Sequence, residues 1–228
     1  MDPETWIKRT EMLIREKCAG DASGHDWPHI ERVRGLATQI GEELGADRLR
    51  VELGALLHDI ADWKFHDGDS EVGPRRAADW LLLLGAPGKL AEDVATIVRE
   101  VSFKGAGVQT PASTLEGQIV QDADRLDAIG AIGVARAFAY GGSKGRAMHD
   151  PAIPPQMHAD FEAYKKNSGP TLNHFYEKLL LLKDRLNTEP ARRIAEQRHR
   201  FMEQFLKQFL AEWDCADAAA ILAKSGGD

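Results

Sequence analysis

Apolar residues recur at intervals of three and four along almost the whole chain, and this spacing constrains the fold more than any other feature. Residues 30–44 and 172–186 show it most clearly, with apolar side chains on one face of successive helical turns. Runs that alternate apolar and polar residues, as half-buried strands do, form no clear segment. The spacing therefore predicts an all-α protein.

We expect helices at residues 4–18, 27–44, 48–63, 72–84, 88–101, 114–139, 156–167, 171–186 and 189–213. Two start signals support these helices. Asp26 precedes a first turn that contains Pro28, and Ser113 with Glu116 has the spacing of a capping box. Residues 140–155 contain three glycines and three prolines and are expected to form an irregular segment, either a lid or a connection.

Gly130 and Gly133 lie inside the expected helix 114–139. Glycine lowers helix propensity but lets another helix approach closely, which predicts tight packing around Asp124. No repeat, low-complexity tract or flexible linker divides the chain. We therefore expect one domain over residues 1–228.

The composition is that of a globular protein, with 43% hydrophobic and 29% charged residues, and the formal net charge is −7. This charge favours no stable nucleic-acid partner, so a small anionic substrate would need a local positive site. Cys18 and Cys215 lack metal-site spacing and are expected to be reduced thiols. The N-terminus has neither a basic start nor an apolar run, so we expect a cytoplasmic protein without a membrane span.

Histidine and aspartate side chains interrupt the apolar faces at three places. His29 shares a helical face with Val33 and Ile40 and should point inward; by itself it is more often a hydrogen-bonded core histidine. The doublet His58-Asp59 lies in an apolar segment, where a buried carboxylate needs a counter-charge. A divalent metal ion would supply that charge.

Adjacent helical residues diverge by about 100°, so His58 and Asp59 need further ligands from packed neighbours to complete a site. Asp62, one turn beyond His58, either orients and deprotonates a water or is a solvated or helix-capping acid. Asp122 and Asp124 differ by about 200° of rotation and cannot readily reach the same ion. Periodicity alone does not choose between them.

The ordered residues His29, His58-Asp59 and Asp124 resemble the HD-domain superfamily of metal-dependent phosphohydrolases, whose pattern is H…HD…D on a helical core. The resemblance covers about residues 20–140, and residues 24–26, 58–62 and 121–131 look like small standalone bacterial HD hydrolases, some of them nucleotide pyrophosphohydrolases. It implies an HD helical bundle completed by additional C-terminal helices.

The resemblance also implies that His29, His58, Asp59 and Asp124 bind one divalent metal ion, which leaves Asp122 as a hydrogen-bonding residue. Mn²⁺ is the family-based preference, and Mg²⁺, Fe²⁺, Ni²⁺, Co²⁺ and Zn²⁺ also suit imidazole and carboxylate donors. Such an ion lowers the pKa of water toward about 7. By the same resemblance His58, Asp59 and Asp62 are catalytic, with Asp62 accepting or relaying the proton.

The expected reaction is hydrolysis of a phosphoester or phosphoanhydride, with a nucleotide as the substrate class. Nucleoside triphosphate pyrophosphohydrolase is favoured. The alternatives are a nucleoside monophosphate phosphatase and a non-catalytic regulatory module that binds a metal and a phosphorylated ligand.

Substrate phosphates need cationic or hydrogen-bonding partners. The candidates are His25, Arg125, Lys64, Lys144 and Arg146, with His25 and Arg125 favoured by proximity to the metal ligands. Arg32 is either a further candidate or a structural residue. The loop at residues 141–146 is not a Walker motif. A homodimer is possible, and no heptad pattern decides the question.

Overall fold

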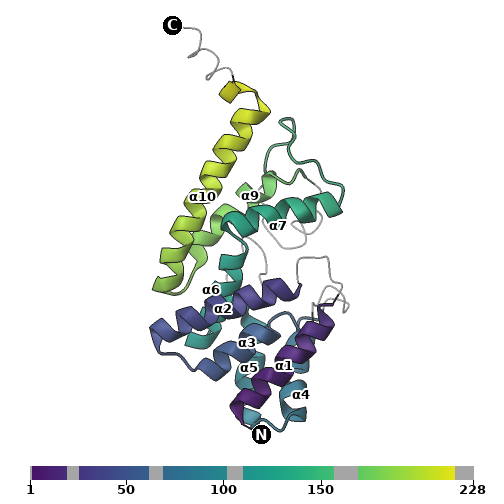
Figure 1. Ribbon diagram of the computed structural model, residues 1–228, viewed down its shortest axis with the longest axis vertical. Helices are drawn as coiled ribbons and strands as arrows, with labels where there is room; N and C mark the ends of the chain where they lie inside the picture. The colour runs from purple at the N-terminus through teal and green to yellow at the C-terminus, as the bar shows by residue number, and fades with distance from the viewer. Residues whose placement is uncertain (1, 20–25, 62–68, 102–109, 157–168, 219–228) are drawn as a thin grey trace.

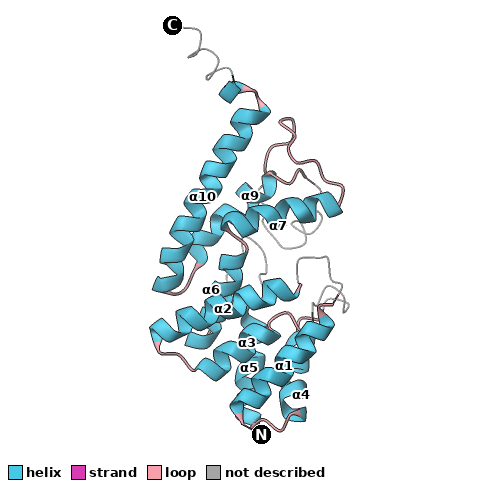
Figure 2. Ribbon diagram, viewed as in Figure 1, coloured by secondary structure: helices cyan, strands magenta, loops and turns pink. Residues whose placement is uncertain are grey.

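The computed structural model describes residues 2–19, 26–61, 69–101, 110–156 and 169–218 (Figure 1). Every regular element in these ranges is a helix, which confirms the all-α prediction (Figure 2). The elements are α1 (Pro3–Lys17), α2 (Trp27–Leu44), α3 (Arg48–Leu57), α4 (Val72–Leu83), α5 (Gly88–Val101), α6 (Leu115–Asp127), α7 (Gly130–Ser143), α9 (Asn173–Glu177), the 3₁₀ helix η2 (Leu179–Arg185) and α10 (Glu189–Trp213).

Side-chain caps begin the helices that later position the site. The carboxylate of Asp26 accepts a hydrogen bond from the backbone N–H of His29 at 3.0 Å and starts α2 as predicted. At α6 the predicted capping box is wrong: Thr114 is the cap and accepts from the N–H of Gly117 at 3.0 Å. The backbone N–H of Ser113, which a box would pair with Glu116, donates instead to Glu100 at 2.9 Å, and the Glu116 carboxylate accepts from the backbone N–H of Asp47.

The ends of several helices differ from the predicted ones. The predicted helix 48–63 ends at Leu57, where the N–H of Ile60 donates to the Leu57 carbonyl and closes a tight turn. The predicted helix 171–186 is divided into α9 and η2 at Lys178, whose φ of −144° and ψ of −58° are not helical. Helix α7 continues to Ser143, so the irregular segment begins later than residue 140. The predicted helix 156–167 falls almost entirely outside the described residues.

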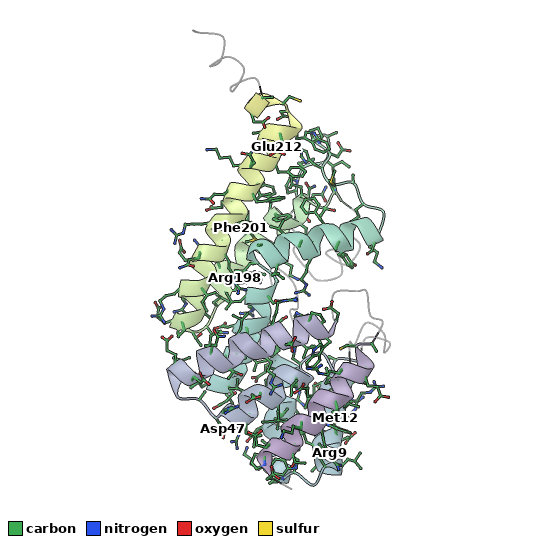
Figure 3. All side chains as sticks on the ribbon, viewed as in Figure 1. Arg9, Met12, Asp47, Arg198, Phe201 and Glu212 are labelled. Carbon is green, nitrogen blue, oxygen red and sulfur yellow. The ribbon has the colours of Figure 1, made fainter. Side chains whose placement is uncertain are left out.

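The predicted helix 114–139 is two helices, because the chain turns sharply between α6 and α7. Gly130 has a φ of +76°, which L side chains rarely adopt, and a Cβ there would lie 3.0 Å from the Arg198 side chain. A Cβ on Gly133 would collide with the carbonyl oxygen of Ala128. Arg198 projects from α10 to this corner and donates to the Leu126 carbonyl at 2.6 Å (Figure 3). The close approach that these glycines allow is therefore at the corner and against α10.

Two groups of buried side chains hold the helices together. One group lies among α1, α3, α4 and α5 at the end of the molecule that holds the N-terminus (Figure 1). The other runs from α2, α3 and α5 across α6 to α9, η2 and α10. Because this second core is continuous across α6, the C-terminal helices complete the bundle, as predicted.

No described helix combines the length and apolar character needed to cross a bilayer. Cys18 is half-buried, Cys215 is exposed, and the two cysteines do not form a disulfide.

Candidate metal centre

His29 lies in the first turn of α2 with its imidazole only 1% exposed. The Asp26 cap fixes the start of this turn, so the backbone that carries His29 has a defined position. Its Nδ1 atom lies 2.8 Å from Oδ2 of Asp127 on α6. Its Nε2 atom faces the end of α3.

His58 is the C-terminal cap of α3, and its imidazole is also 1% exposed. Its Nδ1 atom lies 2.8 Å from the carbonyl oxygen of Ala55. A carbonyl oxygen only accepts, so Nδ1 of His58 carries a proton, and Nε2 is the nitrogen left to bind a metal ion or a second proton. The helix ends here, and this changes the direction of the chain enough for Asp59 to reach the same point as His58.

Four side chains from three helical regions converge at this point. Nε2 of His29 and Nε2 of His58 are 3.3 Å apart. Oδ2 of Asp59 lies 3.5 Å and 3.4 Å from these two nitrogens, and Oδ1 of Asp124 lies 3.6 Å and 3.9 Å from them. The donor atoms of His29, His58 and Asp59 all lie within 4.8 Å of one another.

The hydrogen bonds of the two imidazoles show that this point attracts positive charge. At His29 the ionised Asp127 carboxylate, 2.8 Å away, accepts the Nδ1 proton, while Nη1 of Arg136 is a more distant 3.3 Å. Both Nε2 atoms therefore face each other and the two carboxylates, and this position favours a cation, either a proton or a metal ion. Burial lowers the pKa of His58, but the charges of Asp59 and Asp124 outweigh this and raise the pKa to about 9.

The donor atoms of His29, His58 and Asp59 form a group that could hold one divalent metal ion, and Oδ1 of Asp124 lies within 3.9 Å of both imidazole nitrogens. Metal–nitrogen and metal–oxygen bonds of about 2.0–2.2 Å separate two ligands of the same ion by roughly 3.0–4.4 Å, depending on the angle between them. The five separations between donor atoms, from 3.3 to 3.9 Å, fall in this range. Two imidazoles and two carboxylates suit several divalent ions, so the donor chemistry does not select Mn²⁺.

Asp122 and Asp124 face different partners, as the two-residue spacing requires. Asp122 is fully buried, and its carboxylate accepts four hydrogen bonds from the backbone and side chains of Asn187 and Thr188, at the start of α10. Asp124 faces the two imidazoles. The structure therefore gives Asp122 a hydrogen-bonding role and places Asp124 with the other proposed ligands.

Asp127 belongs to this site although the sequence analysis did not select it. Its carboxylate is 1% exposed and accepts two hydrogen bonds from Arg32, at 2.6 and 3.0 Å, and one from Arg136, at 2.6 Å. Burial raises the pKa of Asp127, but the hydrogen bonds from His29 and Arg32 outweigh it and hold the pKa well below its usual range. Its spacing of three residues from Asp124 was a signal available in the sequence.

The structure describes only some of the predicted phosphate-binding residues. His25, Lys64 and the predicted acid–base residue Asp62 lie outside the described residues. Arg125 is buried and donates to the Arg185 carbonyl and, at 2.9 Å, to the Thr110 hydroxyl, so it has structural partners and its contact with substrate stays a prediction.

Lys144 and Arg146 follow α7, and both cations lie 5.7 Å from the centre of the Tyr140 ring. Lys144 is exposed and Arg146 is half-buried. Their part in substrate binding stays a prediction.

The chain is similar to proteins of known structure. A family model of the HD domain matches residues 27–129, a range that includes His29, His58, Asp59 and Asp124. The uncharacterized protein YpgQ of Bacillus subtilis is 42% identical over 207 residues, which cover 89% of this chain and 92% of YpgQ. A solved structure of YpgQ in complex with ADP has a TM-score of 0.71 and covers 90% of this chain and 96% of that one.

Two further solved structures support the same relationship. A Lactobacillus plantarum protein matches with a TM-score of 0.81 at 36% identity, over 94% of this chain and 100% of that one. An HD-superfamily hydrolase from Bacillus thuringiensis matches with a TM-score of 0.72 at 44% identity, over 93% of this chain and 99% of that one. This chain therefore belongs to the HD superfamily of metal-dependent phosphohydrolases.

Proposed function

We propose that this enzyme hydrolyses nucleoside triphosphates to nucleoside monophosphates and pyrophosphate, with one divalent metal ion, preferably Mn²⁺. The observation that carries the metal-dependent part is the convergence of two Nε2 atoms, 3.3 Å apart, with the carboxylates of Asp59 and Asp124. A cation held there supplies a Lewis acid that activates water and polarises a phosphoryl oxygen.

The exposed fractions of the four proposed ligands favour one side for the approach of substrate. The imidazoles of His29 and His58 are each 1% exposed, whereas the side chains of Asp59 and Asp124 are 28% and 30% exposed. The carboxylate side of the site is therefore the more exposed one. That side is where water and a phosphate group can reach the site.

The nucleotide class rests on a relative. YpgQ has been crystallised with ADP, and ADP contains the kind of phosphoanhydride bond that we propose for the substrate. We assign to Asp62 the removal of a proton from the attacking water, and to His25, Lys64, Lys144 and Arg146 contacts with the phosphates. The single-domain organisation, the cytoplasmic location and a homodimer stay predictions.

A matrix of metals and substrates tests the reaction. Metal-stripped protein is mixed with Mn²⁺, Mg²⁺, Ni²⁺, Co²⁺, Fe²⁺ or Zn²⁺ and with nucleoside mono-, di- or triphosphates, and the products are separated by chromatography. Pyrophosphate and a monophosphate from a triphosphate support the proposal. Orthophosphate from monophosphates would select the phosphatase. No turnover in any combination would indicate a different phosphorylated substrate or a regulatory role.

Matched variants connect turnover to the site. Asp124→Asn is expected to lose both metal binding and turnover. Asp122→Asn is the control on the same helix and should retain turnover per folded molecule. Lys144→Ala and Arg146→Ala should raise KM with little change in kcat, because their proposed role is to bind phosphate.

A further inference from the structure

Two neighbouring helices each carry a pair of site residues three positions apart. On α2 the pair is His29 and Arg32, and on α6 it is Asp124 and Asp127. Residues with this spacing lie on the same helix face, so each helix presents two side chains to the site. Arg32 holds both oxygens of Asp127, and Asp127 in turn lies 2.8 Å from Nδ1 of His29.

We propose that Asp127 is a positioning residue for the metal centre: it accepts the Nδ1 proton of His29 and thereby directs the Nε2 lone pair of His29 to the metal. This inference rests on the proposed metal site. A histidine ligand that donates its second nitrogen to a carboxylate has its tautomer and ring orientation fixed, and loss of such a carboxylate weakens metal binding by about 10–100-fold.

The arginines hold Asp127 in the position that this role requires. Arg32 on α2 contacts both carboxylate oxygens, and Arg136 on α7 contacts Oδ2, the oxygen that also faces His29. A carboxylate with 1% exposure would be unfavourable as an anion without such partners. Because Arg136 comes from α7, the segment that follows the family-matched region also contributes to the support of a proposed metal ligand.

A simpler explanation is that Asp127 only joins α2, α6 and α7 through ion pairs. Two variants separate the explanations. Asp127→Asn loses the charge, and with it the ion pairs, but keeps an oxygen that can accept the Nδ1 proton. Asp127→Ala loses both. A positioning role predicts that asparagine rescues part of the metal affinity, whereas a purely ionic role predicts equal losses.

The test is a titration of metal-stripped protein with Mn²⁺, in which free Mn²⁺ is followed by electron paramagnetic resonance. We expect Asp127→Ala to weaken the Kd for Mn²⁺ by about 10–100-fold, with Asp127→Asn in between. Asp122→Asn is the matched control, since it alters another buried carboxylate of α6 and should leave the Kd unchanged. Thermal unfolding followed by circular dichroism measures the loss of stability in each variant.

Three results would overturn the proposal: a Kd for Asp127→Ala within about tenfold of wild type, equal losses in the two Asp127 variants, or an equal loss in Asp122→Asn. A second measurement needs no variant. In Zn²⁺-loaded, ¹⁵N-labelled wild type, long-range ¹H–¹⁵N spectra should place the His29 proton on Nδ1, and a proton on Nε2 would refute the proposal. Wild type that binds neither ion would instead refute the proposed metal-dependent function.

Discussion

Asp122→Asn and Asp124→Asn should affect different properties of the protein, although only one residue separates the two positions on α6. Asp122 accepts four hydrogen bonds at 2.8–2.9 Å, two from Asn187 to Oδ1 and two from Thr188 to Oδ2. Asp124 faces the proposed metal position and is 30% exposed. We therefore expect Asp122→Asn to reduce stability and Asp124→Asn to reduce metal affinity.

The size of the stability loss follows from the hydrogen bonds of Asp122. In the asparagine variant one carboxylate oxygen becomes an NH₂ group, which faces one pair of donors in either orientation. The Thr188 hydroxyl can turn to accept, so between one and two bonds are lost. Hydrogen bonds to a charged group contribute about 1.5–3 kcal/mol each. Burial raises the pKa of Asp122, so removal of its charge offsets part of the loss and leaves about 2–4 kcal/mol.

Thermal unfolding of the metal-stripped proteins measures this loss. For a chain of this size 2–4 kcal/mol corresponds to a Tm lower by about 5–15 °C. Asp124→Asn should unfold within about 0.5 kcal/mol of wild type, because Asp124 is partly exposed and solvent screens its charge. A wild-type Tm for Asp122→Asn, or a loss of Mn²⁺ affinity in Asp122→Asn as large as in Asp124→Asn, would refute this reasoning.

Three other changes give separate results. Asp62→Asn should lower kcat by about 10²–10⁴-fold while Mn²⁺ binding in a titration stays unchanged. Gly130→Ala should lower the free energy of unfolding by about 1–3 kcal/mol, because φ is +76° there, whereas Gly142→Ala, in open space in α7, should be neutral or stabilising. Burial raises the pKa of Glu52, but two arginine hydrogen bonds lower it below its ordinary value. The stability advantage of wild type over Glu52→Gln in urea should therefore be full above about pH 4.5 and shrink as the pH falls below it.

The helical class was predictable because apolar spacing is a property of short segments, and the positions of helix breaks were not. Gly130 was expected inside one helix, but its φ of +76° breaks the helix there, and Arg198, 68 positions away in the sequence, packs against it. Likewise, Ser113 and Glu116 had the spacing of a cap, yet Glu116 is used by the N–H of Asp47. Local patterns indicate which helices form, and tertiary partners decide where they end.

The same distinction applies to the site. His29, His58, Asp59 and Asp124 were selected by their order along the chain, and the fold brings their donor atoms together. Rotation on a helix excluded a shared role for Asp122 and Asp124 but could not say which one faced the histidines. That choice depends on which side of α6 packs against α2 and which side meets the start of α10. The family resemblance supplied the choice, and the four hydrogen bonds to Asp122 now explain it.

The same three-residue spacing on α2 and on α6 lets each helix hold a side chain of the other in position. Helix α6 places Asp124 at the proposed metal position and, one turn later, Asp127 behind His29. Helix α2 places His29 at the same position and, one turn later, Arg32 behind Asp127. Each helix thus supplies one proposed ligand and the support for the other helix's side chain. A shift of α2 against α6 would separate His29 from Asp127 and also move His29 relative to Asp124, so this helix contact positions two of the four proposed ligands, while His58 and Asp59 depend on the end of α3.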